Sequence, residues 1–356
     1  MNIWIIGLML IPLFGDPAAK LEKDGLLIKV ASTVDSSFYS TLYINSKFAK
    51  QLIKSKSKVT VHRPELPRAT IEVGQNKYIF DSYSHLFDMK KGKEITLNPA
   101  IRKELEKTVE AVEKKHYGQL ISWDAMKKVF SRMSYAEITD LETGEAFRVQ
   151  RRAGSRHADV QPLTKEDTAT MKKIYKGEWS WRRRAILLSI DGKSYAASMH
   201  GMPHGAGAIR GNNFPGHFCV HFNGSSTHLR LEPDPSHHLM IRKASGGLNQ
   251  FLLHAKPLEV VDTFLLSLHE QDSSTMGMTI SVVSFPFSID KITGVNYKVK
   301  QAVEENSDPL ATEIPVEMSY FEEGSGLRKG TWVFHVKRAS TEERWKITDI
   351  QFMLID

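Results

Sequence analysis

The only cysteine in this chain of 356 residues lies between two histidines, in the order His217, Cys219 and His221. Side chains of a strand alternate between two faces, so these three residues would share one face and the apolar positions 218, 220 and 222 the other. An imidazolium beside a thiol favours the thiolate, which is the nucleophilic form of sulfur. The segment therefore predicts a reactive cysteine, with a buried and inert cysteine as the alternative interpretation.

Histidines are concentrated around this segment. Eight of the fourteen fall in one stretch, at positions 157, 200, 204, 217, 221, 228, 237 and 238. Histidine transfers protons near neutral pH and is also the commonest metal ligand in proteins. The cluster therefore indicates either acid–base catalysis or metal binding. We expect His228 and the pair His237 and His238 to lie outside the site, with the pair solvated at the start of a helix.

Turn and capping signals predict the elements that position these residues. Asp191 and Gly192 suit a two-residue hairpin turn, and the second strand of this hairpin ends at His200. A loop rich in glycine and proline, 201–216, leads from there to the cysteine strand. Asp234 precedes a proline and caps a helix after that strand.

The flanking regions carry clear secondary-structure signals but no catalytic cluster. On the N-terminal side, Asn98 and Pro99 mark the start of an amphipathic helix that follows several short strands. On the C-terminal side, an apolar stripe at 260–268 predicts a helix, and alternating strands follow it. This order resembles the nuclear-transport-factor-like or cystatin-like α+β domains, a resemblance that implies no site residues.

The first residues predict export. An apolar run at 3–15 and the small, turn-prone stretch 16–19 are typical of a secretory signal peptide, with a buried strand as the alternative. The run is shorter than the roughly 20 residues that a helix needs to span a bilayer. In an oxidising compartment a lone cysteine has no internal disulfide partner, which favours a working thiol. We therefore expect a secreted or envelope-associated protein with no integral membrane span in the mature chain.

Composition and charge indicate which classes of binding partner to expect. The formal net charge is +7, but the basic residues are dispersed and no nucleic-acid motif occurs. We expect no nucleic-acid partner; a mild positive charge suits an anionic surface such as a cell wall. The predicted fold class is α+β and multidomain, with a mostly-β central catalytic domain flanked by small α+β domains. The predicted units are a signal peptide at 1–19 and domains at 20–133, 134–250 and 251–356.

Two motifs in the middle region carry a family resemblance: a His-Gly pair at 200–201 and the run Gly-His-Phe-Cys-Val-His at 216–221. They resemble the signature of the L,D-transpeptidase (YkuD-like) catalytic domain, which is a His-Gly, a glycine-rich interval, and Ser/Thr-His-Gly-Cys followed by one residue and Arg or Asn. The matching positions are His200, His217 and Cys219, and the departures are Gly216, Phe218 and His221. The resemblance covers roughly a third of the chain.

This resemblance implies a YkuD-like sandwich and a cysteine acyl-enzyme mechanism on peptidoglycan stem peptides, without a cofactor. The blocks 157–160, 201–204 and 216–222 are also similar to those of a group of proteins from spore-forming bacteria, and the second block favours His204 over His200 as the base. Transpeptidation and hydrolysis both remain open.

The residues themselves suit the same roles. Cys219 would be the nucleophile, His200 or His204 the general base, and His217 a donor that orients the reacting groups. Backbone N–H groups near Phe218 and Cys219 are candidate oxyanion donors. A phenylalanine in place of the family's glycine removes backbone freedom and close substrate approach, so the substrate or the activity can differ from the family's.

Four further residues are assigned to substrate binding: His157, Asp159, His221 and Gly216. His157 and Asp159 are two positions apart, which places both on one face of a strand, although an ordinary polar loop is the alternative. The run 179–184 combines tryptophan with arginine. It suits stacking on sugar rings or binding of an anionic polymer, with a packed strand entry as the alternative.

Two rival functions use the same region. A zinc-dependent peptidoglycan peptidase would hold its metal through His157, Asp159, His217 and His221. Against it, only one residue separates the first two, and no Glu-x-x-His motif follows. The other rival is a wall-binding protein without catalytic activity, in which Cys219 would not react readily with alkylating agents.

Overall fold

The computed structural model of the chain describes residues 25–33, 36–45, 47–227, 232–281, 289–299 and 308–355. The predicted signal peptide and His228 lie outside these ranges. Within them, the chain is a mixed α+β protein with eight α-helices and three β-sheets, one of them a closed barrel. The expected α+β class with a mostly-β middle region is therefore confirmed. None of the helices in these ranges combines the length and the apolar composition that a membrane crossing needs.

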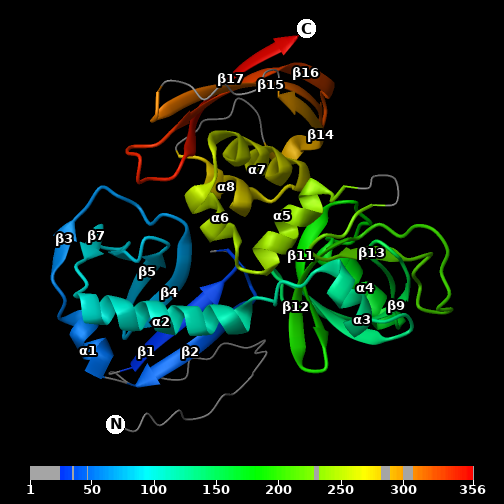
Figure 1. The fold of residues 1–356 in the computed structure, drawn as a ribbon, viewed down its shortest axis with the longest axis horizontal. Coiled ribbons are helices and arrows are strands. Elements are labelled where there is room, and N and C mark those ends of the chain that lie inside the picture. The colour runs from blue at the N-terminus through cyan, green and yellow to red at the C-terminus, as the bar shows by residue number, and fades with distance from the viewer. Residues whose placement is uncertain are drawn as a thin grey trace.

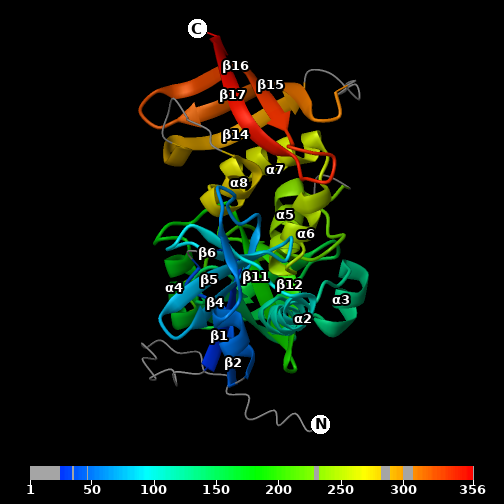
Figure 2. The ribbon, with the colours of Figure 1, turned by 90° about the vertical axis from the view of Figure 1, so that its left-hand side faces the viewer.

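The N-terminal region is a seven-stranded antiparallel sheet in the order β2-β1-β4-β5-β6-β7-β3. Its elements are β1 (Gly25–Ala31), β2 (Tyr39–Asn45), α1 (Lys47–Ile53), β3 (Ser57–Val59), β4 (Pro67–Val73), β5 (Asn76–Asp81), β6 (Leu86–Asp88), β7 (Lys93–Ile95) and α2 (Pro99–His116). The side chain of Asn98 accepts from the N–H of Ile101, which confirms the predicted cap. Helix α2 packs on β1 and β2 and is seen end-on in Figure 2.

The middle region is a closed barrel of six antiparallel strands in the order β10-β13-β12-β11-β8-β9. The strands are β8 (Tyr135–Asp140), β9 (Ala146–Ala153), β10 (Ala158–Pro162), β11 (Arg183–Ile190), β12 (Lys193–His200) and β13 (Phe218–His221). Asp191 and Gly192 both have positive φ, as the predicted hairpin turn between β11 and β12 requires. The strand β12 ends at His200, as expected.

Apolar side chains fill the barrel, and two helices pack against it. The helices are α3 (Trp123–Val129) and α4 (Lys165–Ile174), the second opened by a capping box at Thr164. Trp123, Met126 and Phe130 belong to the barrel's apolar core, so α3 packs with the middle region although it precedes position 134. The structure thus groups residues before the predicted boundary with the barrel.

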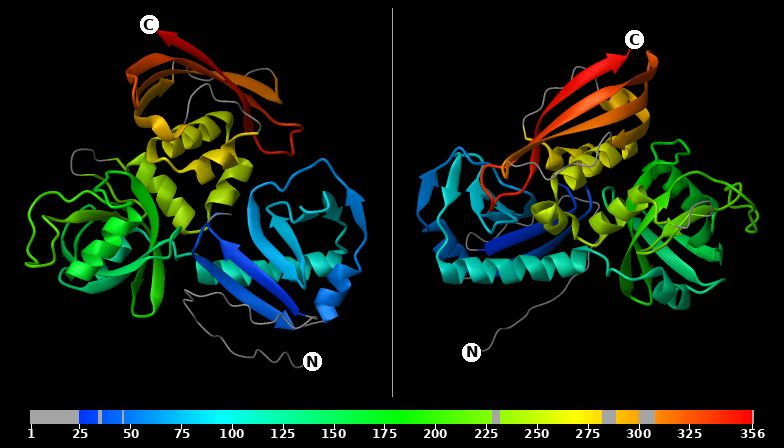
Figure 3. Two further views of the ribbon diagram at one scale, coloured as in Figure 1. Left: turned by 180° about the vertical axis from the view of Figure 1, so that it is seen from behind. Right: turned by 45° about the horizontal axis from the view of Figure 1, so that its top comes forward.

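Four helices lie at the centre of the molecule, between the barrel and the two sheets (Figure 1). They are α5 (Pro235–Ala244), α6 (Leu248–His254), α7 (Pro257–Glu270) and α8 (Ser273–Thr279). Helix α5 packs on the outer faces of β11 and β12. The predicted boundary after residue 250 falls inside α6. The view from behind in Figure 3 shows the same arrangement of three lobes around these helices.

The C-terminal region is a four-stranded antiparallel sheet in the order β14-β15-β16-β17. Its elements are a 3-10 turn (Ile289–Lys291), β14 (Ile292–Val299), β15 (Ala311–Glu322), β16 (Gly326–Lys337) and β17 (Lys346–Ile355). The predicted apolar stripe of α7 is buried against it, including Val261, Phe264 and Leu265. The helix at 260–268 and the antiparallel sheet occur as expected, with the short helix α8 between them.

Candidate functional site

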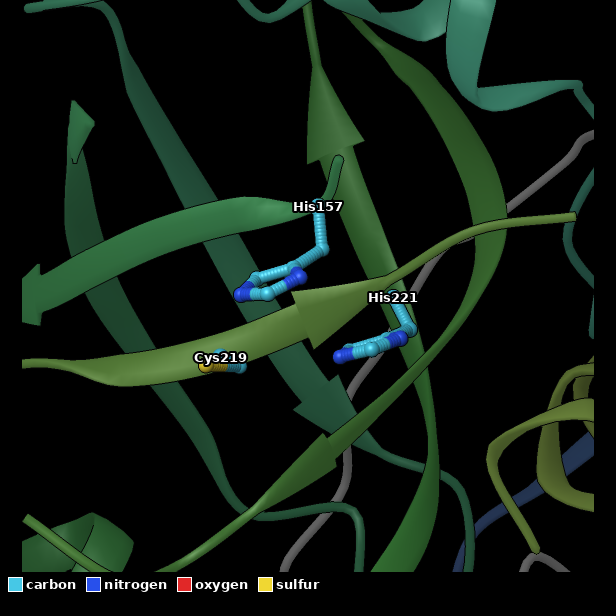
Figure 4. Close-up of side chains that lie close together, drawn as sticks. All are labelled: His157, Cys219 and His221. Carbon is cyan, nitrogen blue, oxygen red and sulfur yellow. The ribbon is translucent and has the colours of Figure 1, made fainter. Parts of the chain in front are cut away.

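The cysteine strand alternates as its sequence predicts. Phe218 and Val220 point into the barrel core, and Cys219 and His221 lie on the opposite, outward face. Figure 4 shows Cys219 and His221 on this strand with His157 on its neighbour. Cys219 is only 5% exposed. The candidate site therefore lies on the outside of the barrel wall, where α5 and the 201–217 loop cover the strands.

The neighbouring strand β10 supplies a carboxylate. Asp159 is the register partner of Cys219, and its Oδ1 lies 3.9 Å from the cysteine Sγ. The ladder between β10 and β9 shifts register next to Asp159, an irregularity of the kind that re-aims side chains beside functional sites. His157, just before β10, places its Nε2 3.1 Å from the same Oδ1. His157 and Asp159 thus share one face, as expected.

Of the two candidate bases, His204 is the one that contacts the sulfur. Its Nε2 lies 3.4 Å from Sγ of Cys219, and its Nδ1 lies 3.1 Å from the carbonyl oxygen of Met202. A carbonyl only accepts, so Nδ1 carries the proton and Nε2 of the neutral ring has a lone pair toward the thiol. The ring of His200 lies behind that of His204, with centroids 5.2 Å apart. His200 accepts from the N–H of Met202 and supports the loop.

His217 lies on the open side of the sulfur. Its Nδ1 is 3.0 Å from the carbonyl oxygen of Ala206, and its Nε2 is 4.0 Å from Oδ1 of Asp159. Its ring centroid is 4.5 Å from that of His204. The structure therefore brings together Cys219, Asp159, His157 and both flanking histidines of the loop.

Three imidazoles form a stack beside this group. The ring of His221 lies parallel to that of His157 at 4.5 Å and to that of His237 at 3.7 Å. Nδ1 of His237 is 2.9 Å from the hydroxyl of Ser198 on β12. His221 is thus buried beside the cysteine and is not part of an exposed substrate surface.

The expectation that His237 is solvated is wrong, whereas its neighbour His238 is exposed. His237 is buried because it lies on the inner face of α5 together with Met240, Ile241 and Ala244. These positions are spaced i, i+3, i+4 and i+7, which is the apolar stripe of a packed helix. That spacing was the available sequence signal that His237 is buried beside the site.

Burial sets the resting protonation of the group. It raises the pKa of the Cys219 thiol, and the negative charge of Asp159 raises this pKa further. Burial also lowers the pKa of His200 and His237 well below the ordinary value, and that of His204 to a smaller extent. The resting pair is therefore a neutral thiol beside a neutral imidazole. This finding runs against the expectation of a resting thiolate, because a neutral imidazole at His204 gives the sulfur no positive charge.

Gly216 has a structural role in the site. Its φ is +114°, and a Cβ there would lie 2.4 Å from the carbonyl oxygen of His204. Its own carbonyl accepts from Nε2 of Gln161 at 2.6 Å. Glycine is required here because the loop and the strand approach each other closely.

The departure at Phe218 leaves the outward face unchanged. Its ring packs inside the barrel against Phe147 and Phe214. The aromatic ring and the sulfur of Cys219 therefore lie on opposite sides of β13. The ring therefore does not obstruct the site.

The tryptophan and arginine run divides between two roles. Trp181 is 51% exposed, and its ring lies 4.7 Å from that of His200 and 5.3 Å from that of His204. Arg183 forms an ion pair with Asp234, and Arg184 forms one with Asp140, so both cations are paired within the protein. Trp181 is the member of the run that reaches the site from solvent.

No protein-family model matches the chain, and no curated protein matches it. The chemistry of the site is therefore inferred from its own residues and distances.

Proposed function

We propose that the protein is a cysteine-dependent acyl transferase of the cell envelope that acts on peptidoglycan stem peptides, with Cys219 as nucleophile and His204 as general base. The observation that carries this proposal is the 3.4 Å contact between Sγ and Nε2, combined with the Met202 carbonyl that holds the proton on Nδ1. In this tautomer, Nε2 is ready to take the thiol proton.

The reaction divides into two steps. Sγ attacks the peptide carbonyl, a C–S bond forms and the amide C–N bond breaks, while the thiol proton passes through His204 Nε2 to the leaving amine. An acceptor amine or a water molecule then attacks the thioester. The C–S bond breaks, a new C–N or C–O bond forms, and the proton returns through His204 to the sulfur. An amine acceptor gives transpeptidation and water gives hydrolysis, and no cofactor enters either step.

Asp159 supports the base during this transfer. Its negative charge raises the pKa of His204 against the lowering by burial, so it stabilises the imidazolium that forms when the thiol proton moves. The same charge opposes a free thiolate at rest. The pair thus favours proton transfer coupled to attack over a thiolate that waits for substrate. These two effects of the Asp159 charge suit a nucleophile that stays protonated until a peptide binds.

The N–H of Cys219 is the best candidate for an oxyanion donor. Successive N–H groups of a strand point to opposite edges, so this group points to the same edge as the N–H of His217, which donates to the His204 carbonyl. The pairing of β12 with β13 ends at Met199 and Val220, just before this position. A tetrahedral intermediate on Sγ would accept a hydrogen bond there.

The proposed substrate class rests on the resemblance to L,D-transpeptidases and on the exposed ring of Trp181 at the edge of the site. The matching motif positions His200, His217 and Cys219 are those of L,D-transpeptidases, and we infer that the barrel is a divergent form of the YkuD-like sandwich. The exposed ring of Trp181 beside His204 would stack on a sugar or a peptide group of the wall polymer. The predicted export and the positive charge are consistent with this location.

The test is turnover of a soluble peptidoglycan digest by metal-free full-length protein, with products separated by mass. We expect Cys219→Ala to abolish turnover and His204→Ala to lower it by about 10²–10⁴-fold. His238→Ala, at an exposed histidine, serves as the control and retains the wild-type rate. Joined stems would identify transpeptidation and shortened stems hydrolysis. Full activity of Cys219→Ala would overturn the proposal.

A further inference from the structure

Three imidazoles around Cys219 are anchored in the same way. The Nδ1 atoms of His157, His204 and His217 lie 2.8, 3.1 and 3.0 Å from the carbonyl oxygens of Ser226, Met202 and Ala206. Each Nδ1 therefore carries a proton, and each ring turns its Nε2 toward the group formed by Cys219 and Asp159. Metal-ligating histidines are held in this manner, with one ring nitrogen bonded to a carbonyl so that the other is free to coordinate.

The spacing of three of the inward atoms is close to that of a coordination shell. Sγ of Cys219 lies 3.4 Å from His204 Nε2 and 3.9 Å from Asp159 Oδ1, which lies 4.0 Å from His217 Nε2. Zinc bonds of about 2.0–2.3 Å in a tetrahedron put ligand atoms about 3.3–3.8 Å apart. The ligand atoms of Asp159, His217 and Cys219 are all within 4.8 Å of one another. Small shifts therefore bring these three atoms to coordination distance, and His204, which contacts Sγ but is not grouped with Asp159 and His217, must turn toward them to complete the shell.

We propose that Cys219, Asp159, His204 and His217 form a tetrahedral binding site for a zinc-type divalent metal ion. One thiolate, one carboxylate and two imidazoles are a donor set that suits Zn²⁺. This set differs from the one expected from sequence, because Cys219 and His204 replace His157 and His221. His157 instead lies behind Asp159, with its Nε2 3.1 Å from Oδ1, and His221 packs in the ring stack.

Rigid backbone holds the four ligands. Cys219 and Asp159 are register partners on adjacent strands of the barrel, and His204 and His217 bond to each other's backbone. The buried thiolate and carboxylate would repel each other, and a cation between them offsets that repulsion. Cys219 and Asp159 lie on strands, which keep such geometry better than loops do, and the reciprocal backbone bonds hold the two loop histidines.

Metal binding and nucleophilic attack exclude each other at Cys219, because a sulfur bound to metal cannot attack a carbonyl. The metal site does not depend on the proposed acyl transfer, since its ligands converge whatever the reaction is. If both hold, the metal-bound protein is an inactive state and zinc protects Cys219 from alkylation.

The test is titration of metal-free full-length protein with Co²⁺ alone, followed by displacement with Zn²⁺. We expect one Co²⁺ per chain, with tetrahedral d–d bands and a thiolate-to-cobalt charge-transfer band that zinc removes. Cys219→Ser should lose the charge-transfer band, and His204→Ala and His217→Ala should each weaken binding at least about tenfold. The control His238→Ala should bind as the wild type does.

The wild-type titration decides the proposal even if a variant misfolds. Absence of stoichiometric cobalt binding overturns the proposal. Cobalt binding that shows no charge-transfer band, and that is unchanged in Cys219→Ser, overturns it as well. A protein that shows the cobalt band but no turnover of the digest refutes the acyl transfer alone. A protein with turnover but no cobalt band refutes the metal site alone.

Discussion

His204 and His217 are joined by a reciprocal pair of backbone hydrogen bonds, in which each N–H donates to the carbonyl of the other at 2.9 Å. This bridge is the only pairing of the 201–217 loop with itself among the described residues that resembles a strand ladder. It fixes His204 over Cys219, because the cysteine follows His217 by two residues. The positions of the base and of the nucleophile are thus set by one short backbone contact.

Gly216→Ala is predicted to disrupt this contact. A Cβ at this position would meet the His204 carbonyl at 2.4 Å, so the loop must move and carry His204 away from the sulfur. We expect turnover of the digest and cobalt affinity to fall at least about tenfold. Gly177→Ala is the matched control, since its φ is also positive at +91° but nothing lies within 4 Å of the added carbon. Equal effects of the two substitutions would refute the role of the bridge.

Phe218→Ala is predicted to destabilise the barrel without removing any site group. The ring is fully buried against Phe147 and Phe214, so its removal leaves a cavity that costs about 3–5 kcal/mol in the free energy of unfolding. Phe321→Ala, at a ring that is 52% exposed, should change stability much less. Urea denaturation measures both. A small effect at position 218 would contradict the inward orientation of this ring.

Lys243→Met tests the contact between the barrel and the central helices. The ammonium group of Lys243 is buried and lies 2.6 Å from Glu142 and 2.7 Å from Asp272. Its removal leaves two carboxylates without this cation, and we expect a loss of about 3–5 kcal/mol in unfolding free energy. Lys173→Met, which breaks an exposed pair with Glu145, should cost less than about 1 kcal/mol. A similar loss of unfolding free energy in both variants would contradict the role of the buried Lys243 ion pairs.

Acid is predicted to weaken the N-terminal sheet through His116. Burial lowers the pKa of this histidine to about 4 from an ordinary value of 6.5. The unfolded chain therefore takes up the proton first, so the stabilisation is complete above about pH 6.5 and is lost as the pH falls toward 4. Between pH 7 and pH 5 the loss is about 2 kcal/mol. His116→Phe should remove this part of the pH dependence in urea denaturation, and an unchanged slope would contradict it.

Local signals predicted the elements well. The caps at Asn98 and Asp234 and the turn at Asp191 each depend on a few neighbouring residues, and all three occur as expected. The alternation around Cys219 was also predicted, because a strand with one apolar face has only one way to be buried. These features need no knowledge of the distant chain.

The partners of the cysteine could not be predicted in the same way. Asp159 lies 60 positions before Cys219, and only the register of β10 against β13 makes them neighbours. The raised pKa of the thiol depends on burial and on this carboxylate, neither of which the residues 217–221 reveal. His237 was missed although the helical spacing to Met240 and Ala244 indicated a buried face.

The most direct measurement is capture of the acyl-enzyme. Metal-free protein is mixed with the soluble digest, quenched in acid and weighed by intact-mass spectrometry before peptide mapping. We predict an added acyl mass on Cys219 that hydroxylamine removes, that is absent from Cys219→Ala and that forms about a hundredfold or more slowly in His204→Ala. An unmodified Cys219, together with undiminished turnover by Cys219→Ala, would contradict the cysteine mechanism.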